Sequence, residues 1–265
     1  MLKITNLTKT FNSGTINEKK ALQGVDLELA PGDFVTVIGG NGAGKSTLLN
    51  MISGVFMSDS GSIVINGQDV TKQPEYRRAS LLGRVFQDPM MGTAGNMGIE
   101  ENLAMAYRRG KTRGLGWGIT NSEREIYKKV LATLDLGLEN RMTSKVNLLS
   151  GGQRQALTLL MATLQKPNVL LLDEHTAALD PKTAKKVLDI TEKIVSDNNL
   201  TTIMITHNMK DAITFGNRLI MMHEGRVIFD IKGEEKKNLK VTDLLEKFEI
   251  ATSGEFEAND RMLLN

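Results

Sequence analysis

The chain of 265 residues has no cysteine, five prolines and one tryptophan, and aromatic residues make up only 5% of it. Without cysteine it can form neither a disulfide nor a thiolate metal site, which fits a reducing compartment. Its longest apolar runs, such as Val169 to Leu172, are far shorter than the roughly 20 residues of a membrane helix, and its beginning lacks the apolar core of a signal peptide. We therefore expect any membrane association to come through a partner.

The charges of the chain nearly cancel. Lysine and arginine total 33 against 31 acidic residues, a net charge of +2. This balance provides no broad basic surface for a phosphate backbone, so nucleic acid is disfavoured as the main partner. Hydrophobic residues at 40% and charged residues at 24% are typical of a globular protein. The length fits one large domain, or one domain with an inserted lobe.

Two kinds of strand pattern occur. Residues 3–30 and 61–70 alternate polar and apolar side chains, which predicts exposed antiparallel strands. Residues 34–38, 169–172 and 202–205 are nearly unbroken apolar runs, which predicts central parallel strands covered on both faces. Ligands of such sheets bind beyond the carboxyl ends of the strands, so we expect the chemistry to follow these three runs.

Residues 88–165 show helical periodicity and little strand character, notably in 99–107, 123–136 and 153–164. We interpret this stretch as an inserted helical lobe. Within it the basic, glycine-rich residues 108–114 are interpreted as a solvated loop without an assigned role. Residues 232–265 are expected to form one short amphipathic helix, over 241–248, and a polar tail.

A phosphate-binding loop follows the first apolar run. Residues 39–46, Gly-Gly-Asn-Gly-Ala-Gly-Lys-Ser, match G-x-x-x-x-G-K-[ST] and precede an apolar helix over 47–52. Glycines let the backbone wrap around phosphate oxygens, and the helix N-terminus adds partial positive charge. Lys45 would reach the β- and γ-phosphates, and Ser46 would supply an oxygen to Mg²⁺. A plain glycine turn is the alternative. The strand–loop–helix context favours nucleotide binding, although this loop alone would equally suit kinases and GTPases.

A second motif decides between these classes. Residues 149–153, Leu-Ser-Gly-Gly-Gln, resemble the signature pentapeptide of the ABC ATPase family. Ser150 and Gln153 also form a capping box that would begin a helix in any fold, and both interpretations hold at once. The other motifs of the family occur in the family's order: Gln87, Asp173-Glu174, Ala178-Leu179-Asp180 and His207. The resemblance covers about residues 1–231.

The resemblance implies an α/β fold with a P-loop NTPase core built on a mainly parallel sheet, an N-terminal antiparallel β-subdomain and an inserted helical subdomain. It also implies hydrolysis of ATP with Mg²⁺ at sites completed between two subunits, where the signature of one faces the γ-phosphate held by the other. A second copy of the chain, or a similar ATPase subunit, is thus the expected partner.

The resemblance assigns roles to individual residues. Glu174 would activate the attacking water and His207 would be the switch histidine, with Lys45 and Gln87 completing the catalytic set. The implied Mg²⁺ ligands are Ser46, Gln87 and Asp173. Phe11 either stacks on adenine or is a buried strand residue. The implied nucleotide-contacting positions are Phe11, Gly39, Asn41, Gly42, Ala43, Gly44, Lys45, Ser46, Thr47, Gln87, Ser150, Gly151, Gly152, Gln153, Asp173 and Asp180.

The chain departs from the family pattern at two positions. The family often has proline or alanine where this chain has His175, and serine where it has Ala177. Because no second histidine or cysteine lies at ligand spacing, we do not interpret His175 as a metal ligand. The missing hydroxyl at Ala177 removes one hydrogen bond between subunits, so we expect the loop ending at Asp180 to work with slightly altered geometry.

Three functions are compatible with a phosphate loop. A kinase-like enzyme is disfavoured by the signature and by His207. A soluble ABC ATPase of DNA repair or translation usually needs two nucleotide domains, a long coiled coil or zinc modules, for which a chain with one phosphate loop leaves no room. We therefore expect the ATPase subunit of a transporter, peripheral to the cytoplasmic face of the inner membrane through separate permease subunits, with a solute-binding protein engaged through the permease.

The direction of transport follows from smaller signals. Residues 142–147 lack the acidic, glycine-containing stretch that often precedes the signature of exporters, which favours an importer. Residues 92–97 and 173–180 resemble those of a bacterial importer group linked to tryptophan, tyrosine and similar small solutes. The methionines Met90, Met91, Met97 and Met105 fit either an adaptable docking surface for the permease or a core, and the sequence leaves both open.

Overall fold

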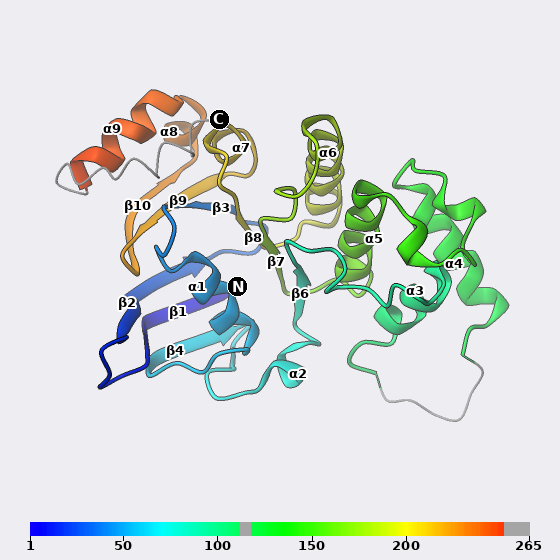
Figure 1. The fold of residues 1–265 in the computed structure, drawn as a ribbon, viewed down its shortest axis with the longest axis horizontal. Helices are drawn as coiled ribbons and strands as arrows, with labels where there is room; N and C mark the ends of the chain where they lie inside the picture. Colours follow the sequence, from blue (N-terminus) through cyan, green and yellow to red (C-terminus); the bar gives the residue numbers. More distant parts are fainter. Residues whose placement is uncertain (112–117, 252–265) are drawn as a thin grey trace.

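A computed structural model describes residues 1–111 and 118–251. The last part of the basic segment and the predicted polar tail lie outside the described residues. The strands form two sheets, with most of the helices gathered on one side of the larger sheet (Figure 1).

The first sheet is antiparallel, with strand order β2-β1-β4-β5. Buried and exposed side chains alternate at the start of β1, as the polar–apolar alternation of the sequence predicts. The prediction of antiparallel strands in this part of the chain is confirmed. The strands are β1 (Leu2–Phe11), β2 (Lys19–Leu29), β4 (Ser60–Ile65) and β5 (Gln68–Asp69).

The second sheet is mostly parallel, with strand order β10-β9-β3-β8-β7-β6. The apolar runs at β3, β7 and β8 pair in parallel and are buried along nearly their whole length. Only β9 and β10 pair antiparallel, which confirms the predicted α/β fold. The strands are β3 (Phe34–Ile38), β6 (Leu82–Val85), β7 (Val169–Asp173), β8 (Thr202–Ile205), β9 (Arg218–His223) and β10 (Arg226–Lys232).

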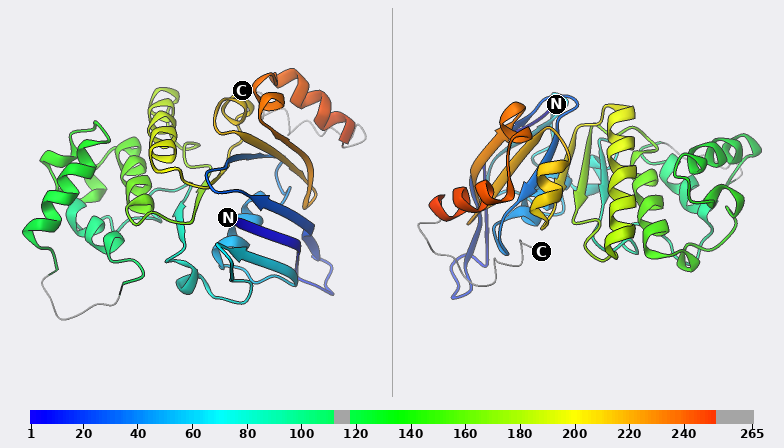
Figure 2. Two further views of the ribbon diagram at one scale, coloured as in Figure 1. Left: turned by 180° about the vertical axis from the view of Figure 1, so that it is seen from behind. Right: turned by 90° about the horizontal axis from the view of Figure 1, so that it is seen from above.

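Both faces of this sheet are covered. On one face a core cluster joins Val35 and Ile203 to α1 (Lys45–Ser53) and to the antiparallel sheet. On the other face Leu170 and Leu172 pack with α5 (Gly151–Thr163) and α6 (Pro181–Asn198). The views in Figure 2 show α1 between the two sheets and α6 beside the larger one. Two-sided burial explains why these strands have no polar face.

The stretch between β6 and β7 is helical, in agreement with its periodicity. A buried cluster that includes Leu103, Tyr127 and Leu157 holds its helices together. One helix begins earlier than predicted because Thr120 caps it with Glu123. The division into domains remains a prediction. The elements of this stretch are α3 (Ile99–Tyr107), α4 (Asn121–Ala132), η1 (Leu138–Asn140), η2 (Val146–Leu148) and α5, and the short α2 (Glu75–Arg78) precedes β6.

The prediction of a solvated basic loop is wrong for its first two residues. Arg108 donates to Glu123 across 2.8 Å, and Arg109 donates to the carbonyl of Ala162 across 3.0 Å. Burial lowers the pKa of Arg109 below its ordinary value. These arginines therefore tie the end of α3 to α4 and α5.

The C-terminal helices pack on the core. Leu244 and Phe248 of α9 (Val241–Ala251) join Ile38 and Leu219 in a buried cluster. Beside them α8 (Glu234–Lys237) buries Lys236, which donates to the carbonyls of Phe215 and Gly216, directly after α7 (Met209–Thr214). Burial lowers the pKa of Lys236 to about 8. Within the part of the chain that the structure describes, no helix is both long and apolar enough to cross a membrane.

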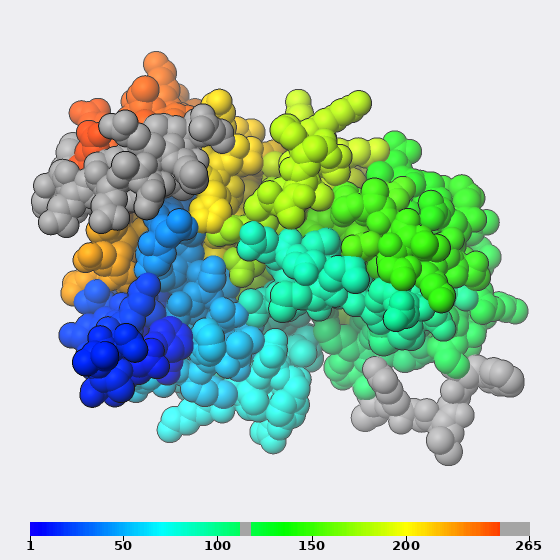
Figure 3. All heavy atoms as spheres, in the orientation of Figure 1, coloured from blue at the N-terminus to red at the C-terminus, as the bar shows by residue number. Residues whose placement is uncertain are grey.

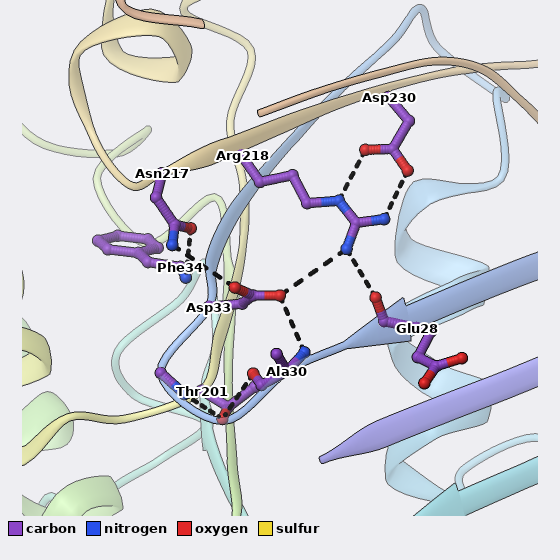
Figure 4. Close-up of polar contacts among 9 residues, drawn as sticks. Glu28, Ala30, Asp33, Phe34, Thr201, Asn217, Arg218 and Asp230 are labelled. Atoms are coloured by element: carbon purple, nitrogen blue, oxygen red, sulfur yellow. Dashed lines mark hydrogen bonds and ion pairs between the residues drawn. The ribbon is translucent and has the colours of Figure 1, made fainter. Parts of the chain in front are cut away.

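One polar network joins the two sheets at the amino end of β3. Arg218 of β9 binds both carboxylate oxygens of Asp230 on β10, at 2.6 and 2.5 Å, and donates to the carbonyl of Glu28 on β2 at 2.6 Å. Asp33 accepts from the backbone of Ala30 and lies 3.8 Å from Arg218 (Figure 4). Three segments distant in sequence thus meet at a single guanidinium.

We predict that Arg218→Met destabilises the protein by about 2–3 kcal/mol, because the Glu28 carbonyl and Asp33 carboxylate lose a shared charged donor. Only 13% of the Arg218 side chain is exposed. Urea unfolding measures the change. The control Lys237→Met breaks an ion pair whose two side chains are 71% and 81% exposed, and it should change stability by less than about 0.5 kcal/mol. Equal effects of the two replacements would contradict the proposed role of the network.

Candidate nucleotide-binding site

The phosphate loop is fixed between β3 and α1. Gly44, the residue before α1, has φ of 99°, and a Cβ there would lie 2.5 Å from the carbonyl oxygen of Ala21 on β2. Only glycine fits this close approach. Lys45 is buried, and its ammonium donates to the carbonyls of Gly39 at 2.6 Å and Gly40 at 3.0 Å. The lysine charge therefore lies in the centre of the loop.

The acidic pair ends β7 and faces the end of β8. Glu174 has φ of +45°, a left-handed conformation that is rare for a side chain of this kind, and its backbone N–H donates to Ile205 at 3.1 Å. Its Oε1 lies 2.5 Å from Nε2 of His207, which follows β8. The Glu174 side chain is 12% exposed and the His207 side chain 39%. The two strand ends thus bring a shielded carboxylate and a more open imidazole into contact.

Asp173 is subject to opposing electrostatic effects. Burial raises the pKa of its carboxyl group, while the guanidinium of Arg84, 3.8 Å away, lowers it. The neighbouring Glu174 raises this pKa further, and a hydrogen bond from Ser46 lowers it. The Ser46 contact brings a hydroxyl of α1 and a carboxylate of β7 together, and oxygen donors of this kind are those that Mg²⁺ prefers. The residues present therefore fit this ion.

Sequence reasoning missed Arg84. This residue lies on β6 and donates to Asn50 at 2.7 Å and to Ser53 at 3.0 Å, both on α1. Its guanidinium also stacks over the ring of Phe86, 4.5 Å from the centroid. The available signal was an arginine within a short, otherwise apolar strand, directly before the Val85-Phe86-Gln87 motif. Arg84 connects the phosphate-loop helix to Asp173.

A pocket of about 460 Å³ opens over the loop. Phe11 lies at its edge, partly exposed and edge-to-face with Phe56 at a centroid distance of 5.2 Å, so it is not a buried strand residue. The pocket thus combines an aromatic edge, a phosphate loop and the Glu174–His207 pair. Its lining residues are Phe11, Lys19, Ala21, Asn41, Gly42, Ala43, Gly44, Lys45, Ser46, Thr47, Glu174 and His207.

The signature residues lie elsewhere on the chain. Ser150 and Gln153 form a capping box at the start of α5, with hydrogen bonds of 3.3 and 3.1 Å. A Cβ at Gly152 would lie 2.2 Å from a methyl carbon of Thr183, so α5 and α6 touch at their amino ends. None of residues 150–153 lines the phosphate-loop pocket. In one chain, the signature does not face the phosphate loop.

Two other predicted site residues also lie outside this pocket. Asp180 caps α6 by accepting from the backbone of Thr183 at 3.1 Å, and hydrogen bonds from the side chain and the backbone of Thr183 lower its pKa. Gln87 is exposed and lines a separate cavity of about 730 Å³, which Asp173 and Arg84 also border. Gln87 is therefore connected to the site through the cavity that borders Asp173.

Comparison with known proteins identifies the family. The model of the ABC transporter family matches residues 22–177, more than half of the chain. The chain belongs to the ABC transporter ATP-binding family. A "Tyrosine transport ATP-binding protein" of Clostridioides difficile is 45% identical over 95% of this chain and all of its own length. The "Energy-coupling factor transporter ATP-binding protein EcfA2" of Acetivibrio thermocellus is 32% identical, over 94% of this chain and 85% of its own.

Solved structures agree with this assignment. A dimeric ATP-binding cassette in a post-hydrolysis state, bound to ADP and Pi, has a TM-score of 0.74 at 30% identity and covers 88% of this chain and 98% of its own. A cassette of an ABC transporter in its ADP conformation has a TM-score of 0.76 at 27% identity, covering 94% and 98%. The chain is thus an ATP-binding cassette of the ATPase class that is coupled to transport, and the expectations of this family and activity are confirmed.

The two departures from the family pattern have different environments in this cassette. His175 is buried, and its Nε2 lies 3.0 Å from the hydroxyl of Thr191, which itself donates to Val187. The imidazole therefore donates to Thr191 and anchors the loop after β7 to α6. Ala177 is exposed, next to the Glu174 end of a cavity between α6 and α7.

We predict that His175 makes the stability of the cassette depend on pH. Burial lowers its folded-state pKa from 6.5 to about 4. Between these two pH values the unfolded chain binds a proton at His175 that the folded chain does not. The free energy of unfolding is therefore highest above the unfolded pKa. It decreases as the pH falls below that value, by at most about 1.4 kcal/mol per pH unit. In His175→Gln this contribution is absent, and urea unfolding at several pH values should give a shallower slope.

The replacement His223→Gln, at the end of β9, is the matched control for loss of a histidine. Identical slopes in the wild type and in His175→Gln would show that His175 is not the titrating group.

Proposed function

We propose that two copies of this chain close around ATP and Mg²⁺, and that each active site combines the phosphate loop of one copy with the signature of the other. The observation that carries the proposal is the separation of the two halves. Lys45, Ser46, Glu174 and His207 gather at one pocket, whereas residues 150–153 lie at a helix N-terminus away from it. A helix N-terminus stabilises anionic charge, and only a second chain can bring it to the phosphates.

Within each site we assign distinct roles to the residues. Lys45 binds the β- and γ-phosphates, and Ser46, Asp173 and Gln87 hold Mg²⁺, which when bound neutralises charge on the phosphate oxygens. Glu174 accepts the proton of the attacking water. Because His207 contacts Glu174, it holds this carboxylate toward the site and senses the γ-phosphate.

The remaining roles place the nucleotide and connect the two copies. Phe11 stacks on adenine, and the loop ending at Asp180 links the two sites. The hydroxyl missing at Ala177 weakens that link without changing the residues that carry out hydrolysis.

We predict that Glu174→Gln traps a closed dimer. The amide cannot accept a proton, so ATP and Mg²⁺ remain bound and hold the copies together. Gel filtration with light scattering should show a dimer with ATP and Mg²⁺ and a monomer without nucleotide. A protein that stays monomeric with bound ATP would refute closure around the nucleotide.

A second replacement in this background tests the shared site. Ser150→Arg places a bulky cation at the signature, so the double variant should still bind a fluorescent ATP analogue but should no longer dimerise. The matched variant Lys45→Ala should lose both properties, because the phosphate loop itself is impaired. If Ser150→Arg abolished nucleotide binding by the monomer, the signature would act within its own chain.

We further propose that the dimer powers an importer of a small solute of the amino acid type. The similarity to a tyrosine transport ATP-binding protein supports this substrate class, and residues 142–147 support the direction. The cassette would lie at the cytoplasmic face of the membrane, attached to separate permease subunits that receive solute from a binding protein.

The helical stretch after Gln87 offers a docking surface for the permease. Met90, Met91 and Met105 are 43%, 69% and 38% exposed, and Met97 is partly buried, so three of these four methionines are surface residues. Met91 also lines the cavity that Gln87 lines, so a partner bound at Met91 would lie near a Mg²⁺ ligand of the proposed site. Unbranched methionine side chains adapt to a partner surface.

We predict that Met91→Glu reduces co-purification with the proposed permease subunits at least about fivefold, because a charge at an apolar contact costs roughly 1–3 kcal/mol when desolvated. Binding of ATP should not change. Ile16→Glu, a fully exposed apolar position in the β1–β2 turn, is the control and should co-purify normally. Normal co-purification of Met91→Glu would place the docking surface elsewhere.

A further inference from the structure

Lys19 is a residue of the nucleotide pocket that no motif identifies. It is the first residue of β2, and in the β1–β2 pairing it lies directly opposite Phe11. Both side chains line the pocket above the phosphate loop. The antiparallel sheet thus presents an aromatic ring and an ammonium side by side to the same cavity.

The side chain of Lys19 reaches across to the loop. Its Nζ lies 3.1 Å from the position that a Cβ would occupy at Gly42, and its Cε lies 4.0 Å from the same position. Lys19 is an exposed residue and belongs to the other sheet. The ammonium therefore lies beside Gly42 of the loop, and Lys45 lines the same pocket.

No carboxylate neutralises this ammonium in the parts of the chain that the structure describes. Among the described residues, no hydrogen bond or ion pair of the Lys19 side chain is found, in contrast to Lys9 in the same sheet, which binds Asp59 at 2.7 Å. An unpaired cation beside a phosphate site adds to the local positive potential and attracts polyanions.

The neighbouring Lys20 provides a contrast within the same strand. Lys20 is exposed like Lys19, but it lies opposite Thr10 in the strand pairing. It does not line the pocket, because successive side chains of a strand point to opposite faces. The two lysines have the same charge and nearly the same position in sequence. Only one is directed at the phosphate loop.

We propose that Lys19 is a second phosphate-binding cation, which contacts the nucleotide polyphosphate from the antiparallel sheet while Lys45 contacts it from the loop. This inference rests on the proposed nucleotide site. The antiparallel sheet then contacts the phosphates through Lys19 as well as the adenine through Phe11. Nucleotides that carry a polyphosphate then gain affinity from Lys19, and adenosine does not.

The test compares Lys19→Met with Lys20→Met by titration with a fluorescent ATP analogue in the presence of Mg²⁺. Methionine keeps the length and apolar stem but removes the charge. We expect Lys19→Met to weaken binding about tenfold at low salt and less at high salt, since a partly exposed charge pair is screened by ions. Lys20→Met should bind as the wild type does, and Lys19→Arg should retain most of the affinity.

Competition with adenosine separates a phosphate contact from a contact with the base or ribose. Adenosine should compete equally well in the wild type and in Lys19→Met. An equal loss of adenosine and ATP affinity, or identical ATP binding by the Lys19→Met and Lys20→Met proteins, would overturn the assignment. If the wild type itself failed to bind ATP, the proposed nucleotide site would be wrong and this inference with it. Thermal unfolding of each variant shows that the comparison is made between folded proteins.

Discussion

The burial of the six-stranded sheet on both faces is the constraint on which the rest of this cassette depends. The space-filling view shows the helical part of the chain, in green, at one end of the molecule and the N-terminal strands, in blue, at the other (Figure 3). With α1 and the antiparallel sheet on one side and α5 and α6 on the other, β3, β7 and β8 are buried along nearly their whole length, so their polar groups reach solvent at the strand ends. Parallel pairing directs the carboxyl ends of these strands to one edge. The phosphate loop, the acidic pair and His207 therefore meet there.

The electrostatics of that edge follow from the same packing. Asp173 ends a buried strand, and desolvation alone would favour its neutral form. Arg84 on the adjacent strand and Ser46 on α1 favour the carboxylate instead. The guanidinium also bonds two residues of α1, so the cation that counters burial is held by the helix that carries the phosphate loop. The contacts of Arg84 thus set both the charge of the Asp173 carboxyl group and the position of the cation beside it.

In the proposed dimer each chain contributes two unlike half-sites, which need different local structures. The phosphate loop requires a strand before it and a helix after it, which the sheet provides. The signature requires only a capped helix N-terminus, and the capping box of Ser150 and Gln153 satisfies that in the helical part. In the proposed dimer the cap that begins α5 also forms the anion site for a partner. Gly152 allows α5 to lie against α6 next to Asp180, the residue that caps α6.

The sequence by itself determined the class of the fold, the order of most elements and the family, because these depend on local features: unbroken apolar runs, alternation in β1, and motifs such as residues 39–46 and 149–153. It did not determine the strands β6, β9 and β10, which are short or carry charges such as Arg218 that only their neighbours neutralise. Tertiary structure alone decided that Arg84 lies beside Asp173, that Lys19 extends over the phosphate loop, and that Arg108 and Arg109 are tied into the helical stretch. Each of these depends on segments far apart in sequence coming within a few ångströms, and no local pattern contains that information.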